Sequence, residues 1–148
     1  MHTSLREKRL PCACTTIKKA SRILGRKYDA LLSTAGMNNT QFAVMRAVSA
    51  HSGEPLVQIA HNLAMDRTSL YRALTPMVRD GWIEIADGEN TRSNSAKLTS
   101  KGARVLAAAE ISWGRIQAHV VKEFGRTSFS SLIQELDRLG AIAEKYDV

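Results

Sequence analysis

Residues 65–82, MDRTSLYRALTPMVRDGW, contain the pattern that most restricts how this chain can fold. Apolar residues recur in this segment at intervals of three and four, which places them on one side of an α-helix. Asp66 precedes the pattern, and its carboxylate can accept hydrogen bonds from the free N–H groups of a first helical turn. We therefore predict a helix that begins after Asp66 and faces a core through five residues: Leu70, Ala73, Leu74, Met77 and Val78.

The opposite side of this predicted helix is polar, aromatic and cationic. It carries Thr68, Tyr71, Arg72, Thr75 and Arg79. One side can thus hold the helix to its domain while the other meets a polyanion. Arg67 lies nearer the core-facing edge, where it could pair with Asp80 or another acid.

A shorter apolar pattern with the same spacing precedes Asp66 and stops at Met65. It comprises Leu56, Ile59, Ala60, Leu63 and Ala64. Two short helices joined by a tight turn form a helix-turn-helix, and a second helix with a polar outer face can enter the major groove of DNA.

Further helices and a hairpin are predicted around this pair. Apolar positions from Ile17 onward predict a helix that ends at Gly36. Asn39 or Thr40 can cap a second helix that runs through Ala50. After the DNA-reading helix, the letters WIEI predict a strand, ADGENTRSNS a polar loop and AKL a short return strand. We interpret this hairpin as a wing.

Two longer helices should follow the wing. Thr99 can cap the first of them. Apolar residues continue at close to a 3.5-residue spacing in both helices, and this stripe exceeds what a small winged domain needs to close its core. We interpret part of it as a subunit interface, with an intramolecular helical hairpin as the alternative. The stripe comprises Leu106, Ala109, Trp113, Ile116, Val120 and Phe124, then Leu132, Leu136, Leu139, Ala143 and Tyr146.

The predicted fold is therefore mainly α-helical with a small β-hairpin wing. Residues 1–35 would form an N-terminal arm and the first dimerisation helix, and residues 36–100 a winged helix-turn-helix DNA-binding domain. Residues 101–148 would supply the C-terminal dimerisation helices. We expect these parts to form one compact unit.

The charge of the chain suggests a polyanionic partner. The formal net charge is +7, and residues 1–35 hold eight basic and two acidic side chains. No apolar run is long enough to span a bilayer, and the first residues lack the apolar stretch of a signal peptide. We therefore expect a cytoplasmic protein without a membrane partner.

Catalysis and metal binding find little support in the sequence. No nucleophile, base and orienting group occur at a recognisable spacing, and GENTRSNS lacks the pattern of a phosphate-binding loop. Cys12 and Cys14 form a C-x-C pair without a second ligand cluster, so that we predict no metal site and no cofactor.

The motifs resemble those of the MarR-type winged helix-turn-helix transcription regulators. The resemblance lies in LVQIAHNLAMDRTSLYRALTPMVRDGWIEI followed by TRSNSAKLTSKG, and the order of elements agrees across nearly the whole chain. It implies a homodimer with interleaved N- and C-terminal helices and two winged domains that read a pseudo-palindrome. Such regulators are usually repressors that a small molecule or an oxidant releases from DNA.

The resemblance also assigns a role to the wing. Members of the family commonly have Asp-x-Arg near the tip, where this chain has Asn90-Thr91-Arg92. Arg92 matches the arginine that enters the minor groove, in which a narrow A·T-rich tract concentrates negative potential. Asn90 replaces the aspartate that usually fixes this arginine, which predicts a looser or differently oriented wing. The candidate DNA contacts are Thr68, Ser69, Tyr71, Arg72, Thr75 and Arg92.

Two hypotheses describe the signal. In the first, an aromatic acid binds near Arg22, Tyr28, His51 and Trp113, where a cation and aromatic walls could hold its carboxylate. In the second, an oxidant attacks Cys14, which then closes onto a cysteine of the other subunit.

The family resemblance bears on the second hypothesis. Cys14 and Tyr28 match positions of the peroxide-sensing branch, whereas Lys18 and Asn39 stand where that branch has further tyrosines. A packed or merely exposed thiol is the alternative. A winged domain used for protein contacts or RNA is the remaining rival function, and it would lack a steep salt dependence of binding to duplex DNA.

Overall fold

The computed structural model describes residues 10–90 and 93–148. The described part is mainly helical, with one two-stranded antiparallel hairpin. The elements in chain order are α1 (Ala13–Leu32), the short 3-10 helix η1 (Ser33–Ala35), α2 (Asn39–Ala50), α3 (Leu56–Asn62), α4 (Arg67–Arg79), β1 (Ile83–Ala86), β2 (Ser95–Leu98), α5 (Ser100–Phe124) and α6 (Arg126–Glu144).

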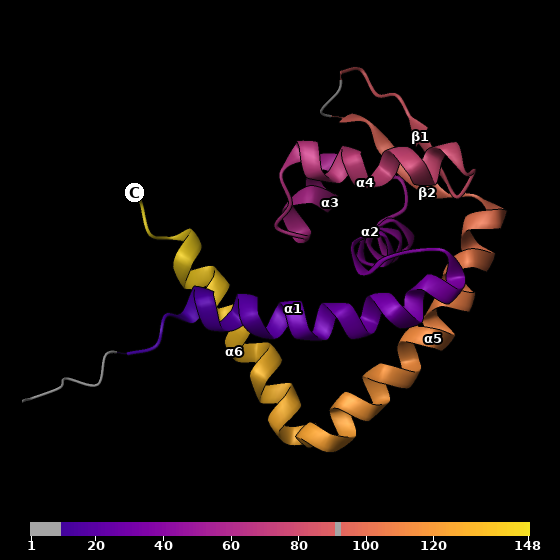
Figure 1. Ribbon diagram of the computed structural model, residues 1–148. Coiled ribbons are helices and arrows are strands. Elements are labelled where there is room, and N and C mark those ends of the chain that lie inside the picture. The colour runs from indigo at the N-terminus through magenta and orange to yellow at the C-terminus, as the bar shows by residue number, and fades with distance from the viewer. Residues whose placement is uncertain (1–9, 91–92) are drawn as a thin grey trace, which may run out of the picture.

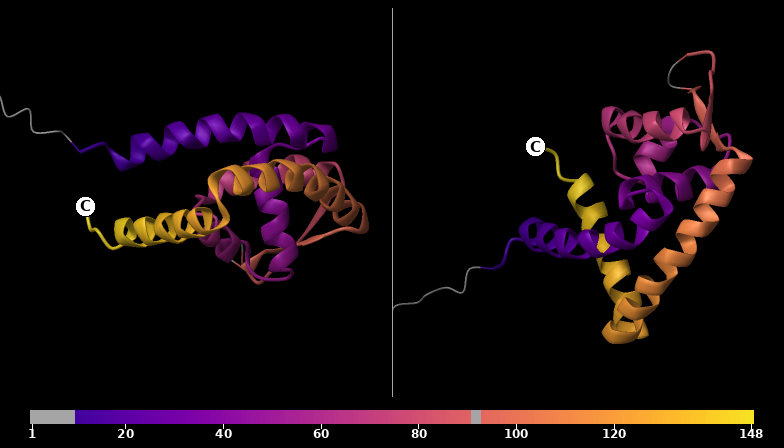
Figure 2. Two further views of the ribbon diagram at one scale, coloured as in Figure 1. Left: turned by 90° about the horizontal axis from the view of Figure 1, so that it is seen from below. Right: turned by 45° about the vertical axis from the view of Figure 1, so that its right-hand side comes forward.

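The helices fall into a winged unit and a set of long helices. Figure 1 shows α2, α3, α4 and the hairpin gathered at one end of the molecule, with α1 passing beneath them. From the base of the hairpin, α5 runs away from this unit, and α6 turns back at an angle to form a V (Figures 1 and 2). Because α1 packs against α5, the long helices are joined to one another beside the winged unit.

The core lies between α2, α3, α4, the hairpin and the first half of α5. Leu70, Leu74 and Met77 of α4 are buried, as the periodicity predicts. Val78 is 38% exposed, so that its predicted place in the core is wrong. Successive residues of an α-helix are about 100° apart, so Val78 lies outside the face of α4 on which Met77 is buried.

Helix boundaries follow the predicted signals with small shifts. α1 begins at Ala13, earlier than the apolar spacing indicates, and the chain leaves η1 through Gly36 with φ +78°. The cap of α2 is Asn38 rather than Asn39 or Thr40, because its side chain accepts from the Gln41 N–H while Gln41 bonds back to the Asn38 N–H.

The first helix of the helix-turn-helix, α3, ends at Asn62, before the last two apolar residues that we predicted for it. Leu63 and Ala64 form the turn that follows, and the Met65 N–H donates to the Ala60 carbonyl. Ala64 adopts φ +50° in this turn. The predicted helix-turn-helix is thus present, with a shorter first helix.

The hairpin is an antiparallel pair that starts one residue later than predicted. Ile83 pairs with Leu98 and Ala86 with Ser95. Trp82, which we expected in the strand, is a buried residue immediately before it. Arg92 lies outside the described residues.

The long helices do not close onto one another as an intramolecular hairpin. Within the described chain, α6 has no buried residue. Its predicted apolar positions are 37% exposed at Leu136 and 38% exposed at Leu132 and Leu139. The apolar face of α6 therefore remains open. None of the helices in residues 10–90 and 93–148 combines the length and apolar character that a bilayer crossing requires.

Candidate nucleic-acid interface

The N-terminus of α4 is fixed by Asp66. The carboxylate of this residue accepts from the Ser69 N–H at 2.7 Å and from the Ser69 hydroxyl at 2.9 Å. These bonds lower the pKa of the Asp66 carboxyl, the backbone bond contributing most. The predicted cap is confirmed. Because the Ser69 hydroxyl already donates to Asp66, it would meet DNA as an acceptor.

The outward face of α4 carries the polar residues that the sequence analysis placed there. Thr68, Arg72, Thr75 and Arg79 are all exposed. The Thr75 hydroxyl donates to the Tyr71 carbonyl at 2.8 Å, which leaves its methyl group and a lone pair to meet a ligand. Figure 1 shows α4 and the hairpin at the same end of the molecule, so that a helix and a wing are available to one surface.

Tyr71 differs from this expectation of an outward-facing side chain. It is half-buried and packs against the core, and its hydroxyl is buried without a hydrogen-bond partner among the described residues. The Arg67 guanidinium lies 5.5 Å from the centre of the Tyr71 ring. In this conformation the Tyr71 hydroxyl cannot meet DNA, and only the part of its side chain that stays exposed is available to it.

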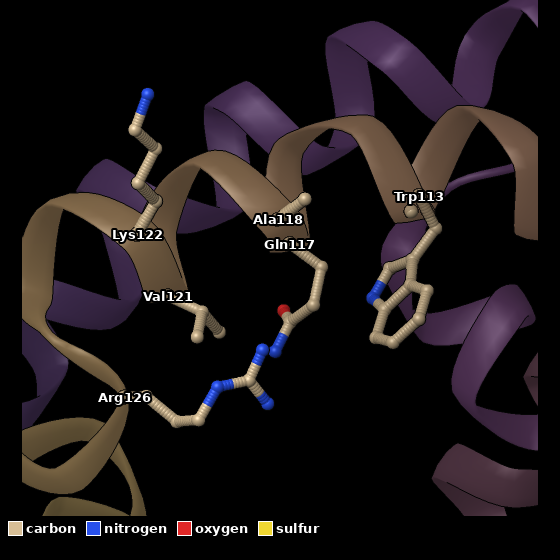
Figure 3. A pocket seen from close by; sticks show the side chains of 7 residues that line it. Trp113, Gln117, Ala118, Val121, Lys122 and Arg126 are labelled. Atoms are coloured by element: carbon tan, nitrogen blue, oxygen red, sulfur yellow. The ribbon is translucent and has the colours of Figure 1, made fainter.

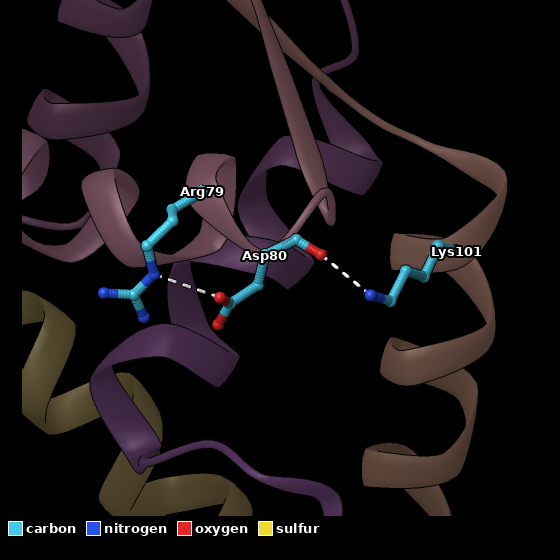
Figure 4. A network of polar contacts seen from close by, with 3 residues as sticks. All are labelled: Arg79, Asp80 and Lys101. Carbon is cyan, nitrogen blue, oxygen red and sulfur yellow. Dashed lines mark hydrogen bonds and ion pairs between the residues drawn. The ribbon is translucent and has the colours of Figure 1, made fainter.

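At the C-terminal end of α4, Asp80 bonds to Arg79 and Lys101 and not to Arg67. The Arg79 Nε lies 3.1 Å from Asp80 Oδ1, and the Lys101 ammonium donates to the Asp80 carbonyl at 2.9 Å (Figure 4). Our prediction that Arg67 could pair with Asp80 is therefore wrong. Lys101 belongs to α5, so that this bond ties the end of the reader helix to the long helix.

Thr99 and Gly102 strengthen the same junction. The Thr99 hydroxyl donates to the Gly81 carbonyl at 2.6 Å and accepts from the Gly102 N–H at 2.9 Å, which confirms Thr99 as the cap of α5. A Cβ atom on Gly102 would lie 1.9 Å from the Trp82 carbonyl oxygen. The first turn of α5 and the segment after α4 are thus in direct backbone contact, and a shift of α5 must carry the end of α4 with it.

The described part of the wing tip is held by its own polar groups. The Asn90 N–H donates to the Ser93 hydroxyl at 3.2 Å, and this hydroxyl donates to the Asn90 carbonyl at 2.9 Å. The Gly88 N–H donates to the Asn94 side chain at 3.1 Å. These bonds shape both sides of the loop that contains Thr91 and Arg92, which are outside the described residues.

The four residues proposed for an effector pocket do not all come together. Tyr28 of α1 donates to Gln117 of α5 at 2.6 Å, and Trp113 lies one turn before Gln117. His51 instead caps the far end of α2 and lies 3.2 Å from Glu54, in a turn whose Gly53 N–H bonds to β2. Arg22 is exposed on α1. The predicted grouping is therefore wrong for His51, because the end of α2 points toward the wing.

Trp113 has a cationic neighbour that the sequence analysis missed. The Arg46 guanidinium of α2 lies 4.7 Å from the centre of the Trp113 ring and 4.0 Å from Glu110 of α5. Phe42 packs against the same indole, with ring centres 5.8 Å apart. Arg46 is one turn after Phe42, so that helical periodicity places them on one face, but their meeting with Trp113 depends on the packing of α2 on α5.

The two thiols are exposed at the start of α1. Hydrogen bonds from the side chain and backbone of Thr15 lower the pKa of the Cys12 thiol, and Cys12 is also the N-cap residue of α1. The surroundings of Cys12 therefore favour its thiolate. The sequence analysis had put forward Cys14 as the target of an oxidant.

Comparisons with known proteins agree with this arrangement. A family model described as the IclR helix-turn-helix domain matches residues 42–85. The transcriptional regulator MosR of M. tuberculosis, solved in complex with DNA, is 33% identical, with a TM-score of 0.80 over 90% of this chain and 97% of that chain. No match is found among curated protein sequences.

Two more distant structures share the fold. The MarR family transcription regulator SP03579 is 22% identical, with a TM-score of 0.73 over 90% of this chain and 92% of that chain. The Staphylococcus aureus MarR, solved with salicylate and kanamycin, is 17% identical, with the same TM-score over 90% and 91% of the two chains.

Proposed function

This chain belongs to the MarR family of winged helix-turn-helix transcription regulators, and we propose that it is a repressor that binds a pseudo-palindromic operator as a homodimer and is released by a small aromatic acid. It is a DNA-binding regulator and not an enzyme. We further propose that it acts in the cytoplasm. The observation that carries the proposal is the exposed polar face of α4, capped at Asp66, in a fold that MosR shares in its complex with DNA.

Each residue of the reader face has a chemically defined role. Arg72 suits a guanine, because a guanidinium can donate two bonds to the O6 and N7 atoms of that base. Thr68 and Thr75 can contact base edges or phosphates, and Ser69 can accept a bond. The part of the Tyr71 side chain that stays exposed suits a thymine methyl group. Arg92 of the wing would enter the minor groove.

Base-specific binding by Arg72 is testable with duplexes selected from a random pool by the wild-type protein. Arg72→Ala should weaken binding to the selected duplex by about 1 to 3 kcal/mol and relax the preference at one position of each half-site. Arg79→Ala is the matched control, since Arg79 already pairs with Asp80 at the end of α4. If the Arg72 variant retains wild-type discrimination among point-mutated duplexes, the assignment is wrong.

The salt dependence of the same binding separates DNA recognition from a protein-contact role. Phosphate neutralisation releases counterions, so that affinity for duplex DNA should fall steeply as salt rises. A winged module for protein contacts would bind the selected duplex weakly at every salt concentration. That result would overturn the repressor proposal.

Dimerisation would use the apolar positions that the described chain leaves open on α1 and α6. Ile17 and Leu24 of α1 are 39% and 43% exposed, and Leu132, Leu136 and Leu139 of α6 are similarly open. Burial of such a stripe against a second copy is favourable, and a symmetric dimer would place two reader helices about 34 Å apart, one turn of DNA.

An aromatic acid is the effector that we favour. Salicylate, one of the two compounds in the S. aureus MarR structure, belongs to this class. Of the four residues predicted for the effector pocket, Tyr28 and Trp113 remain candidates. Tyr28 bonds to Gln117, and Trp113 lies one helical turn before Gln117. A hundredfold loss of DNA affinity would require the acid to stabilise the DNA-incompetent state by about 2.7 kcal/mol more than the competent one.

Oxidant sensing is the second candidate, and the lowered pKa of the exposed Cys12 thiol favours it. Hydrogen peroxide would transfer one oxygen to the thiolate of Cys12 or Cys14 and form a sulfenic acid. Its other oxygen would leave as hydroxide or water. The sulfenic acid could then condense with another cysteine and release water. Peroxide should therefore release DNA from the wild-type protein, but not from the Cys12→Ser/Cys14→Ser variant. Release that survives the loss of both thiols would exclude this mechanism.

A further inference from the structure

Arg46 of α2 contacts two successive turns of α5. Its guanidinium lies 4.7 Å from the centre of the Trp113 ring and 5.6 Å from the centre of the Phe42 ring. Its Nε lies 4.0 Å from a carboxylate oxygen of Glu110, one turn before Trp113. One cation therefore joins the winged unit to the long helix, and the sequence analysis assigned no role to it.

Trp113 marks the point where α5 leaves the winged unit. Among the described residues of α5, those packed in or against the core end at Trp113. Figure 3 shows Trp113 and Gln117 projecting from the same side of α5 on successive turns. Because Phe42 of α2 packs on Trp113 and Tyr28 of α1 bonds to Gln117, this side of α5 meets α2 first and then α1. The Arg46 contact is thus at the outer end of the attachment of α5 to the winged unit.

The beginning of α5 has a separate attachment. The Thr99 hydroxyl donates to the Gly81 carbonyl, and the Lys101 ammonium donates to the Asp80 carbonyl, both just after the reader helix. Trp113 lies about 18 Å further along α5 than Lys101, at about 1.5 Å of rise per residue. A rod attached at one point is free to tilt, whereas two attachments this far apart fix its direction. The contact at Trp113 therefore helps to set the tilt of α5 relative to the reader helix.

The tilt of α5 matters because α6, which carries part of the proposed dimer interface, follows its far end. The segment from Lys101 to Phe124 is about 35 Å long. A tilt of about 5° at the first turn of α5 moves its far end by about 3 Å. This displacement is close to the rise of one base pair, about 3.4 Å. A small change of tilt would thus change the separation of two reader helices by about one base pair.

The strength of the Arg46 contact suits an adjustable attachment. The side chains of Arg46 and Glu110 are 49% and 50% exposed, and an exposed ion pair contributes little. The contact between the guanidinium and the indole therefore carries most of the attraction. Phe42 is buried and would still pack on Trp113 without the cation. Removal of Arg46 should loosen the tilt of α5 without unfolding the winged unit.

We propose that Arg46 is a positioning residue for DNA recognition. Its guanidinium holds the Trp113 indole against α2, which fixes the tilt of α5 and so the half-site spacing that the dimer accepts. The inference rests on the proposed function, since only a dimer has two reader helices to space.

The test measures binding of the full-length protein to three duplexes by fluorescence anisotropy. They are an operator selected by the wild type, the same operator with one base pair inserted between its half-sites, and a duplex with a single half-site. The wild type should prefer the selected spacing about tenfold. Arg46→Met, which keeps an unbranched side chain and loses the charge, should reduce this preference about threefold or more. Its affinity for the single half-site should stay within about twofold of the wild type, because Arg46 acts on spacing.

Three further variants test the contact itself. Arg46→Lys keeps a cation near the indole and should retain more of the spacing preference than Arg46→Met. In a Trp113→Leu background, Arg46→Met should change the preference no further, because the partner is already absent. Arg115→Met, at an exposed arginine of the same helix, is the matched control and should behave like the wild type.

The outcomes separate the inference from the proposed function. If the wild type discriminates between the spacings and Arg46→Met does so equally, the proposed function stands and the positioning role is wrong. Equal effects of Arg46→Met and Arg46→Lys would also overturn it. So would a loss of affinity for the single half-site as large as the loss for the full operator, which would assign Arg46 a direct DNA contact. A wild type that accepts both spacings equally would contradict the reading of a pseudo-palindrome by a dimer, and the positioning role would fail with it.

Discussion

Gly102 provides a direct test of the contact between the long helix and the reader unit. A Cβ atom at this position would lie 1.9 Å from the Trp82 carbonyl oxygen and 2.8 Å from the Trp82 carbonyl carbon. Ordinary carbon–oxygen contacts are about 3.3 Å, so that Gly102→Ala requires the two segments to separate by about 1.4 Å. Both contacting atoms are backbone, and no flexible side chain can move aside.

The expected cost follows from this overlap. Overpacking of a tight site costs about 1 to 3 kcal/mol, whereas alanine stabilises a helix interior by about 0.5 to 1 kcal/mol relative to glycine. The clash should therefore outweigh the gain in helix propensity, and Gly102→Ala should lower the free energy of unfolding. The displaced α5 should also weaken the bonds from Thr99 and Lys101 to the segment after α4.

Gly114→Ala is the matched control, because Gly114 lies in the same helix and its Cβ would meet nothing within 4 Å. This variant should gain about 0.5 to 1 kcal/mol from helix propensity. The assay is urea unfolding followed by circular dichroism, at one protein concentration because dimer stability depends on it. If Gly102→Ala proves as stable as the wild type, or both variants shift in the same direction, the close contact does not hold α5 in place.

The remaining predictions concern the cap, the dimer and the wing. Because the Asp66 pKa is lowered in the folded state, its carboxylate stabilises the protein above the ordinary pKa of 3.8, and this contribution is lost as pH falls through the folded value. Asp66→Ala should therefore lower the unfolding temperature at pH 7, and a difference from the wild type that does not shrink as pH falls below 3.8 would contradict this assignment. Leu136→Glu should place a charge in the subunit interface and yield a 16.3 kDa monomer on sedimentation, whereas Gln134→Glu on the same helix should remain dimeric; a dimeric Leu136 variant would refute the interface. Arg92→Ala should weaken DNA binding and reduce its dependence on flanking A·T tracts, and an unchanged flank preference would show that the wing does not dock there.

The sequence by itself determined the elements whose signals are local. Asp66 and Thr99 were identifiable as caps, because a side-chain acceptor before an amphipathic pattern acts on N–H groups two or three residues away. The buried positions Leu70, Leu74 and Met77 followed from the 3.6-residue period of the helix. Even the adjustment of the α2 cap from Asn39 to Asn38 is a shift of one residue within the same local chemistry.

The tertiary structure decided which side chains meet across distant segments. Val78 and Tyr71 both lie at edges of α4, and the elements packed beside that helix leave Val78 exposed while they cover the Tyr71 hydroxyl. Tyr28 and Gln117 are 89 residues apart, and their hydrogen bond exists because α1 packs on α5. Helical periodicity specifies a face of each helix but not its partner, since the partner depends on how turns such as Gly125 direct the next helix in space. The grouping of His51 with Tyr28 and Trp113 failed for this reason, while the reader helix remained where its local pattern placed it.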